Sequence, residues 1–97
     1  MPSNTVAQVV KKPKEYHVAS FVAQAITSQL SDVEQAITAS KGSEIHAVTP
    51  EGKIVFTLEA STQQAIGKLI DKLKYHTGML SLAPVYHQYL NENNEDN

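Results

Sequence analysis

The stretch Glu44–Ala60, EIHAVTPEGKIVFTLEA, decides the fold, because it holds two strand patterns separated by a turn. Pro50 has the fixed φ that suits the second position of a turn, and Gly52 can adopt the positive φ that many turns require. On both sides of this turn, apolar residues recur with the period of two that is typical of a strand. We therefore predict strands over Glu44–Thr49 and Lys53–Ala60, joined as a β-hairpin.

A helical pattern lies on each side of the hairpin, with apolar residues spaced three and four apart. The two apolar stripes consist of Leu30, Val33, Ala36 and Ile37 before the hairpin, and of Ile66, Leu69, Ile70 and Leu73 after it. Ser61 or Thr62 is the candidate N-cap of the second helix, and Gly78 is its candidate C-terminal stop.

The first helix carries two candidate start signals. Thr27 or Ser28 can act as its N-cap, and Ser31 with Glu34 has the spacing of a capping box one turn later. Gly42 is the candidate C-terminal stop.

Two further strand patterns flank the helices, at Tyr16–Gln24 and at Met79–Leu90. Pro84 lacks a backbone N–H, so the last strand should lie at an edge of the sheet. The order β-α-β-β-α-β predicts an α+β, ferredoxin-like fold, in which a four-stranded antiparallel sheet carries both helices on one face. We expect the domain to span residues 15–90, with a flexible segment at 1–14 and a disordered acidic tail at 91–97.

Alternation along the strands assigns each residue to one face of the sheet. The bulkier set should face the helices; it consists of Ala19, Phe21, Ala23, Ile45, Ala47, Ile54, Phe56, Leu58, Leu80, Leu82 and Tyr86. The opposite, uncovered face should then hold Val18, Ser20, Val22, Gln24, Glu44, His46, Val48, Val55, Thr57, Glu59, Ser81, Ala83, Val85 and His87. A one-residue slip would exchange the two faces of the first strand.

An uncovered face rich in valine and rimmed by carboxylates is typical of an interaction surface. The residues that we expect to contact a peptide are Val18, Ser20, Val22, Val55, Thr57, Glu59, Val85 and Glu44. The pattern alone leaves three alternatives open, which are a partner peptide, self-association as a weak homodimer, and exposed valines without a function.

Composition argues against several other functions. The 97 residues include eight lysines and no arginine, and the formal net charge is -2, so nucleic-acid binding is not expected. There is no cysteine, and the four histidines show no metal-ligand spacing, so we expect no metal site and no cofactor. No motif places a nucleophile beside a base, so we expect no catalytic residues and no enzyme activity. No apolar run is long enough to span a membrane, and residues 1–13 contain no apolar stretch that could form the core of a signal peptide, so we expect a cytoplasmic protein. We expect it to be a monomer or a weak homodimer.

Several segments, in the right order, resemble the NapD family of cytoplasmic chaperones for the periplasmic nitrate reductase. They are His17–Ser20 (HVAS), Pro50–Ala60 (PEGKIVFTLEA), Gly78–Ser81 (GMLS) and Val85–Gln88 (VYHQ). The resemblance covers the whole expected domain. It implies a protein that binds the twin-arginine signal peptide of the nitrate reductase catalytic subunit precursor and prevents its export before cofactor insertion. It also implies that the peptide binds as a helix lying on the sheet.

A second class of function fits the same topology. Amino-acid-sensing domains share the βαββαβ plan, so a stand-alone regulatory domain that binds a small ligand is the alternative to a signal-peptide chaperone. The two readings differ in the ligand, since the first requires a long peptide with a basic and an apolar region.

Overall fold

The computed structural model describes residues 15–91. Its elements are β2 (Glu15–Ala25), η1 (Thr27–Gln29), α2 (Leu30–Thr38), β3 (Ser43–Val48), β4 (Lys53–Ala60), α3 (Gln63–Lys74) and β5 (Met79–Asn91). The predicted order of strands and helices is confirmed. The predicted flexible segment 1–14 and residues 92–97 of the predicted tail lie outside the described residues. Asn91, which we expected to begin that tail, is the last residue of β5.

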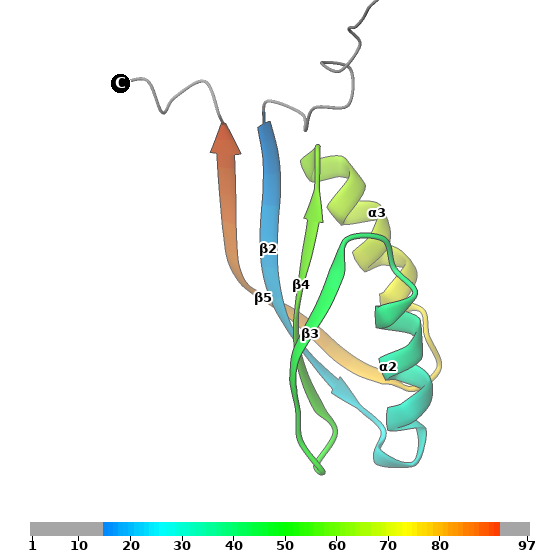
Figure 1. Cartoon of the computed structure of the whole chain (residues 1–97). Coiled ribbons are helices and arrows are strands. Elements are labelled where there is room, and N and C mark those ends of the chain that lie inside the picture. Colours follow the sequence, from blue (N-terminus) through cyan, green and yellow to red (C-terminus); the bar gives the residue numbers. More distant parts are fainter. Residues whose placement is uncertain (1–14, 92–97) are drawn as a thin grey trace, which may run out of the picture.

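The four strands form one antiparallel sheet in the order β3-β4-β2-β5. Both helices pack on the same face of this sheet, as Figure 1 shows, and the predicted ferredoxin-like fold is confirmed. β5, which contains Pro84, lies at an edge as expected, where its missing N–H costs no ladder hydrogen bond. Within residues 15–91, nothing covers the face opposite the helices (Figure 1).

The core lies between the sheet and the two helices. Its buried residues are Ala19, Phe21, Ala23, Ala25, Val33, Ile37, Ile54, Phe56, Leu58, Ile66 and Leu73. The rings of Phe21 and Phe56 stack with their centroids 5.5 Å apart, which fixes the two central strands against each other. The predicted helix-facing sets of β2 and β4 are therefore confirmed, and so is the register of the first strand.

The two helices begin differently. At α3, the Thr62 hydroxyl accepts a hydrogen bond from the Ala65 N–H at 3.0 Å, which confirms the predicted N-cap. At α2, the predicted caps are wrong: Thr27 and Ser28 belong to the short 3-10 helix η1, and no side chain caps the first turn of α2. Ser31 is the second residue of α2 and makes no capping box.

Gly42 serves the turn into β3 rather than the end of α2. The helix already ends at Thr38, with Ala39 still in the right-handed region. Gly42 has a φ of 81°, and its carbonyl accepts a hydrogen bond from the Glu59 N–H at 3.0 Å. The glycine therefore joins the α2–β3 turn to the end of β4. The prediction that Gly42 is the C-terminal stop of the first helix is wrong.

Candidate functional site

The uncovered face of the sheet brings most of the predicted peptide-binding residues together. The register of β2 and β4 opposes three pairs, which are Val18–Glu59, Ser20–Thr57 and Val22–Val55. Directly opposite residues of an antiparallel pair point to the same face of a sheet. Because the neighbours Ala19 and Phe21 are buried under the helices, these six side chains project from the other face.

An apolar row crosses all four strands of this face. Val22 lies opposite Val55 at the centre, and the row continues to Ala47 on β3 and to Ala83 on β5. Val55 is 36% exposed, Val22 is half-buried, and the two alanines are exposed. Apolar surface that stays in contact with water is unfavourable, so a ligand that covers this row gains free energy in proportion to the area it covers.

A polar row runs beside the apolar one. Thr57 and Ser20 occupy its centre, Glu44 lies at the β3 end and Tyr86 at the β5 end. The Nε2 atom of His46 lies 3.0 Å from the Thr57 hydroxyl oxygen, and the two are hydrogen-bonded. Hydroxyl and carboxylate oxygens are hydrogen-bond acceptors, so this row suits a cationic group.

The two predicted carboxylates lie on the same face but on different strands. Glu44 is on the edge strand β3, opposite Thr57, and Glu59 is at the end of the central strand β4, opposite Val18. Both are exposed. The face is therefore apolar at its centre and acidic at two separate points of its rim.

A bulge in β3 corrects one part of the predicted face. The register between β3 and β4 shifts between Ile45 and Ala47, so that Ala47 lies opposite Val55 and Val48 lies opposite Ile54. Because Ile54 is buried under the helices, Val48 belongs to the helix-facing side and Ala47 to the uncovered face. The prediction had these two residues reversed, since an extra residue in one strand inverts the alternation beyond it.

Two further bulges, both in β5, change the face of the sheet on which the β5 residues lie. Leu80, predicted to be in the core, lies at a register shift and is 64% exposed. A second shift, at Val85, places Tyr86 opposite Ser20 and His87 opposite Ala19. Tyr86 therefore belongs to the uncovered face and His87 to the helix side, the reverse of the prediction.

Val85 itself remains a strongly exposed residue of this region. It occupies the bulge between Pro84, opposite Phe21, and Tyr86, opposite Ser20, and it is 64% exposed. Proline inside a strand favours a bulge beside it. Pro84 was therefore the sequence signal that could have revealed Tyr86 as a residue of the uncovered face.

The fold brings two of the four histidines into contact. His17 Nδ1 and His87 Nε2 lie 2.7 Å apart, with the rings at 87° to each other. No local pattern indicates this pair, because the two residues lie 70 positions apart. Among residues 15–91, no group of three or more histidine, aspartate or glutamate side chains is arranged to hold a metal ion.

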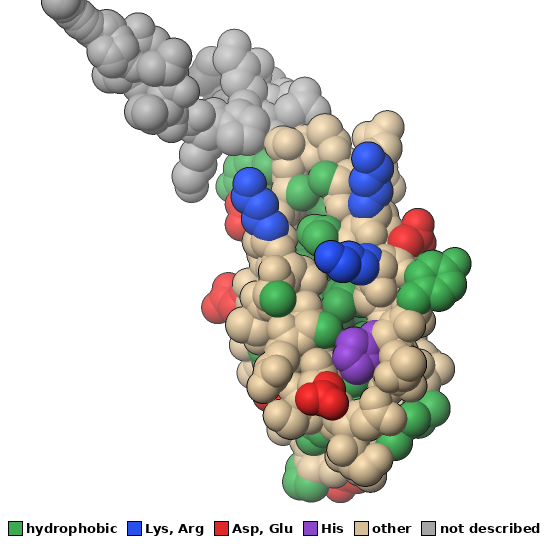
Figure 2. Space-filling model, turned by 90° about the vertical axis from the view of Figure 1, so that its right-hand side faces the viewer, with side chains coloured by type: hydrophobic (Ala, Val, Ile, Leu, Met, Phe, Trp, Pro, Cys, Tyr) green, Lys and Arg blue, Asp and Glu red, His purple; other side chains and the backbone are tan. Residues whose placement is uncertain are grey.

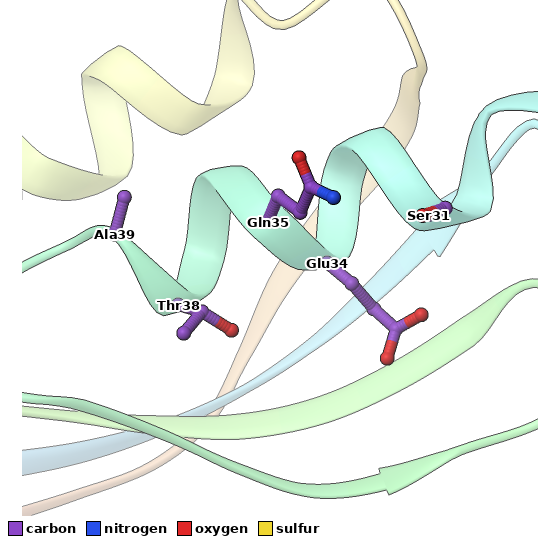
Figure 3. Close-up of a pocket in the computed structure, with 5 residues that line it drawn as sticks. All are labelled: Ser31, Glu34, Gln35, Thr38 and Ala39. Carbon is purple, nitrogen blue, oxygen red and sulfur yellow. The ribbon is translucent and has the colours of Figure 1, made fainter.

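A shallow depression lies on α2, and Figure 3 shows its lining. Its residues are Ser31, Glu34, Gln35, Thr38 and Ala39. Glu34 is the single carboxylate among them and points to the strand side of the helix, away from α3 (Figure 3). One carboxylate beside hydroxyl and amide groups supplies no activated nucleophile, so this surface is a poor candidate for catalysis.

Comparisons with known proteins agree with the fold. The family model described as NapD protein matches residues 16–91. The chaperone NapD of Escherichia coli K12 is 31% identical over 75 residues, covering 75% of this chain and 85% of the relative. The chaperone NapD of Haemophilus influenzae is 22% identical over 91 residues, covering 93% of this chain and 98% of the relative.

The solved structures include a relative as well. The solution structure of the E. coli Tat proofreading chaperone NapD superposes with a TM-score of 0.69 at 28% identity, over 75% of this chain and 78% of that one. Neither helix of residues 15–91 has the length and hydropathy of a membrane span. The family match covers nearly all of the described residues, and this chain therefore belongs to the NapD family of chaperones.

Proposed function

We propose that this chain binds the twin-arginine signal peptide of the periplasmic nitrate reductase catalytic subunit precursor. In this proposal it acts in the cytoplasm, without catalysing a reaction, and delays export until the cofactor has been inserted. The observation that carries the proposal is the apolar row of the uncovered sheet face in a member of a chaperone family. A chaperone acts on another protein, and this face is a continuous apolar surface suited to one.

The chemistry of a signal peptide matches the two rows. Such a peptide joins a basic region to an apolar region. As a helix on the sheet, it would set its apolar side on Val22 and Val55, while its arginines approach Glu44 or Glu59. Arginine suits this contact because its planar guanidinium can donate two parallel hydrogen bonds to one carboxylate.

The apolar row and the carboxylates should contribute different amounts of binding free energy. An exposed ion pair contributes about 0.2–1 kcal/mol, whereas full burial of one valine contributes about 1.5–3 kcal/mol. Val22 is already half-buried, so its share is smaller, yet several such residues together exceed the ion pairs. We therefore expect the apolar row to supply most of the affinity and the carboxylates to select peptides with arginine.

Titration by fluorescence anisotropy tests the proposal. The full chain is added to a labelled twin-arginine signal peptide and to a matched peptide with both arginines replaced by glutamine. We expect saturable binding of the native peptide at micromolar protein and weaker binding of the control. Amide shifts in an NMR titration should fall on the central strands, around Val22 and Thr57. No binding at micromolar protein, or shifts confined to the helices, would refute the proposal.

A further inference from the structure

A groove runs along α3 on the surface of the helix layer, beside the C-terminal end of α2 and the turn that follows it, on the opposite side of the molecule from the uncovered sheet face. Two adjoining depressions of about 460 Å³ each form it, and they share Lys41, Leu69 and Lys72. Figure 2 looks onto this layer and shows hydrophobic side chains along its middle, with lysines gathered around the upper part. We call this surface the helix groove.

The floor of the helix groove is apolar. Ala36 of α2 and Ala65, Leu69 and Leu73 of α3 line it, and all but the buried Leu73 are partly exposed. Alanines on facing helices leave space that larger side chains would fill. The groove can therefore accept apolar side chains of a ligand without a rearrangement of the core.

The walls of the helix groove are positively charged. Lys41, Lys68 and Lys72 line it and are exposed. Glu59 is the single acidic residue in the lining. It lies opposite Val18 in the β2–β4 register, so its side chain projects from the uncovered face of the sheet. The chain as a whole has a formal net charge of -2, so this concentration of cations runs against the overall charge.

The three lysines have no carboxylate partner within the described residues. Lys74 pairs with Asp71 at 3.9 Å, and neither residue lines the groove. Lys68 and Lys72 are four apart on α3, so they lie one turn apart on one wall and repel each other. Negative charges from a ligand would relieve this repulsion.

We propose that the helix groove binds an acidic amphipathic helix of a partner protein. A helix laid along the groove, beside α3, places residues at i, i+3, i+4 and i+7 on the apolar floor. Glutamate or aspartate residues on its flanks would then meet Lys41 on one wall and the pair Lys68 and Lys72 on the other. The site is separate from the sheet face, so both surfaces can be occupied together.

A protein partner fits this surface better than a nucleic acid does. Nucleic-acid sites combine cations with arginine or with several stacking aromatics. This chain has no arginine, and Tyr75, at one end of the groove, is the single Phe, Tyr or Trp residue in its lining. The floor between the lysines is aliphatic, which favours leucine-like side chains over phosphates.

The test uses a synthetic helical peptide with leucines at i, i+3, i+4 and i+7 and glutamates on both flanks. A matched peptide carries lysine at every glutamate position. We titrate each into the ¹⁵N-labelled full chain and follow the amide resonances. The glutamate peptide should shift residues 65–73 and Lys41, leave Val22 and Val55 unchanged, and bind in the same way when a twin-arginine peptide is present.

Variants locate the charges that matter. The double variant K68E/K72E should weaken binding of the glutamate peptide by roughly tenfold or more, and the effect should shrink at high salt. K74E is the matched control on the same helix, outside the groove, and should bind as the native chain does. K68Q/K72Q, which removes charge without reversing it, should give a smaller loss, and thermal unfolding checks that each variant is folded.

Four results would overturn the proposal. The first three are equal binding of the lysine peptide, amide shifts on the sheet face instead of the groove, and an equal loss of binding in K74E. A single-stranded oligonucleotide that binds the groove as tightly as the glutamate peptide would also overturn it, because the site would then respond to any polyanion. None of these results bears on binding of the signal peptide to the sheet, which is measured separately.

Discussion

Val22 of β2 and Val55 of β4 lie directly opposite each other at the centre of the uncovered sheet face. The two valines are flanked in the same row by Ala47 and Ala83, so the row is apolar from one edge of the sheet to the other. A peptide that docks on this face must cover this pair, and the pair is therefore the best place to test the proposed function.

Val22→Asp should abolish binding of the twin-arginine peptide while leaving the domain folded. The new carboxylate would have to lose its water beneath the ligand, which costs several kcal/mol if it stays charged. Val22 is only half-buried in the free protein, so we expect a loss of stability of about 1 kcal/mol. Anisotropy measures the binding and urea unfolding the stability.

Val48→Asp is the matched control for that experiment. The β3 bulge places Val48 opposite Ile54, on the helix-facing side at the sheet edge, where it is 37% exposed. Peptide affinity should therefore stay within about twofold of the native value. If Val48→Asp abolished binding as Val22→Asp does, the assignment of the β3 residues to the two faces would be wrong.

Glu59→Gln should weaken peptide binding modestly, and more at low than at high salt. An exposed ion pair contributes about 0.2–1 kcal/mol, which corresponds to a factor of about 1.4 to 5 in affinity, and salt screens it. Glu34→Gln is the control, because Glu34 lies on α2 in the helix layer. An unchanged affinity of Glu59→Gln at low ionic strength would exclude Glu59 as an arginine partner.

Gly42→Ala and Gly67→Ala should change stability in opposite directions. Gly42 has a φ of 81°, and a Cβ there would collide with the backbone carbonyl of Glu59, so we expect a loss of about 1–3 kcal/mol. Gly67 is exposed within α3, and a Cβ there meets nothing within 4 Å. Alanine at Gly67 should stabilise the protein by about 0.5–1 kcal/mol through its higher helix propensity.

The two glycine variants are compared by urea denaturation under the same conditions. A gain of stability in Gly42→Ala would show that the turn before β3 is not held as described. A loss of stability in Gly67→Ala would show that α3 packs closely on its surroundings at this residue, against the open space around it.

Thr62→Ala should lower the free energy of unfolding by about 1 kcal/mol. The Thr62 hydroxyl accepts a hydrogen bond from the Ala65 N–H, and alanine would leave that donor of the first turn without its side-chain partner. Ser31→Ala is the control, since Ser31 lies inside α2 and caps nothing, and its effect should stay within about 0.5 kcal/mol. A similar loss in both variants would indicate that the serine has a role at the start of α2.

The sequence by itself determined the order of the elements and the core residues of the two helices and of β2 and β4. Periodicity is a local property: the stripe from Ile66 to Leu73 can bury itself only as one side of a helix, and the alternation around Phe21 and Phe56 only as one face of a strand. The N-cap at Thr62 was equally predictable, because capping involves neighbours in the chain.

Only the tertiary structure decided which residues of the edge strands share the uncovered face. The bulges near His46, Leu80 and Val85 each add one residue to a strand and invert the alternation beyond it. A bulge is set by the fit between two strands far apart in the chain, so the alternation within β3 or β5 does not reveal it, and Pro84 is the one local signal that marks the position of such a bulge. For the same reason the helix groove could not be predicted, since Lys41, in the turn after α2, comes close to Lys68 and Lys72 of α3 only when both helices pack on the sheet.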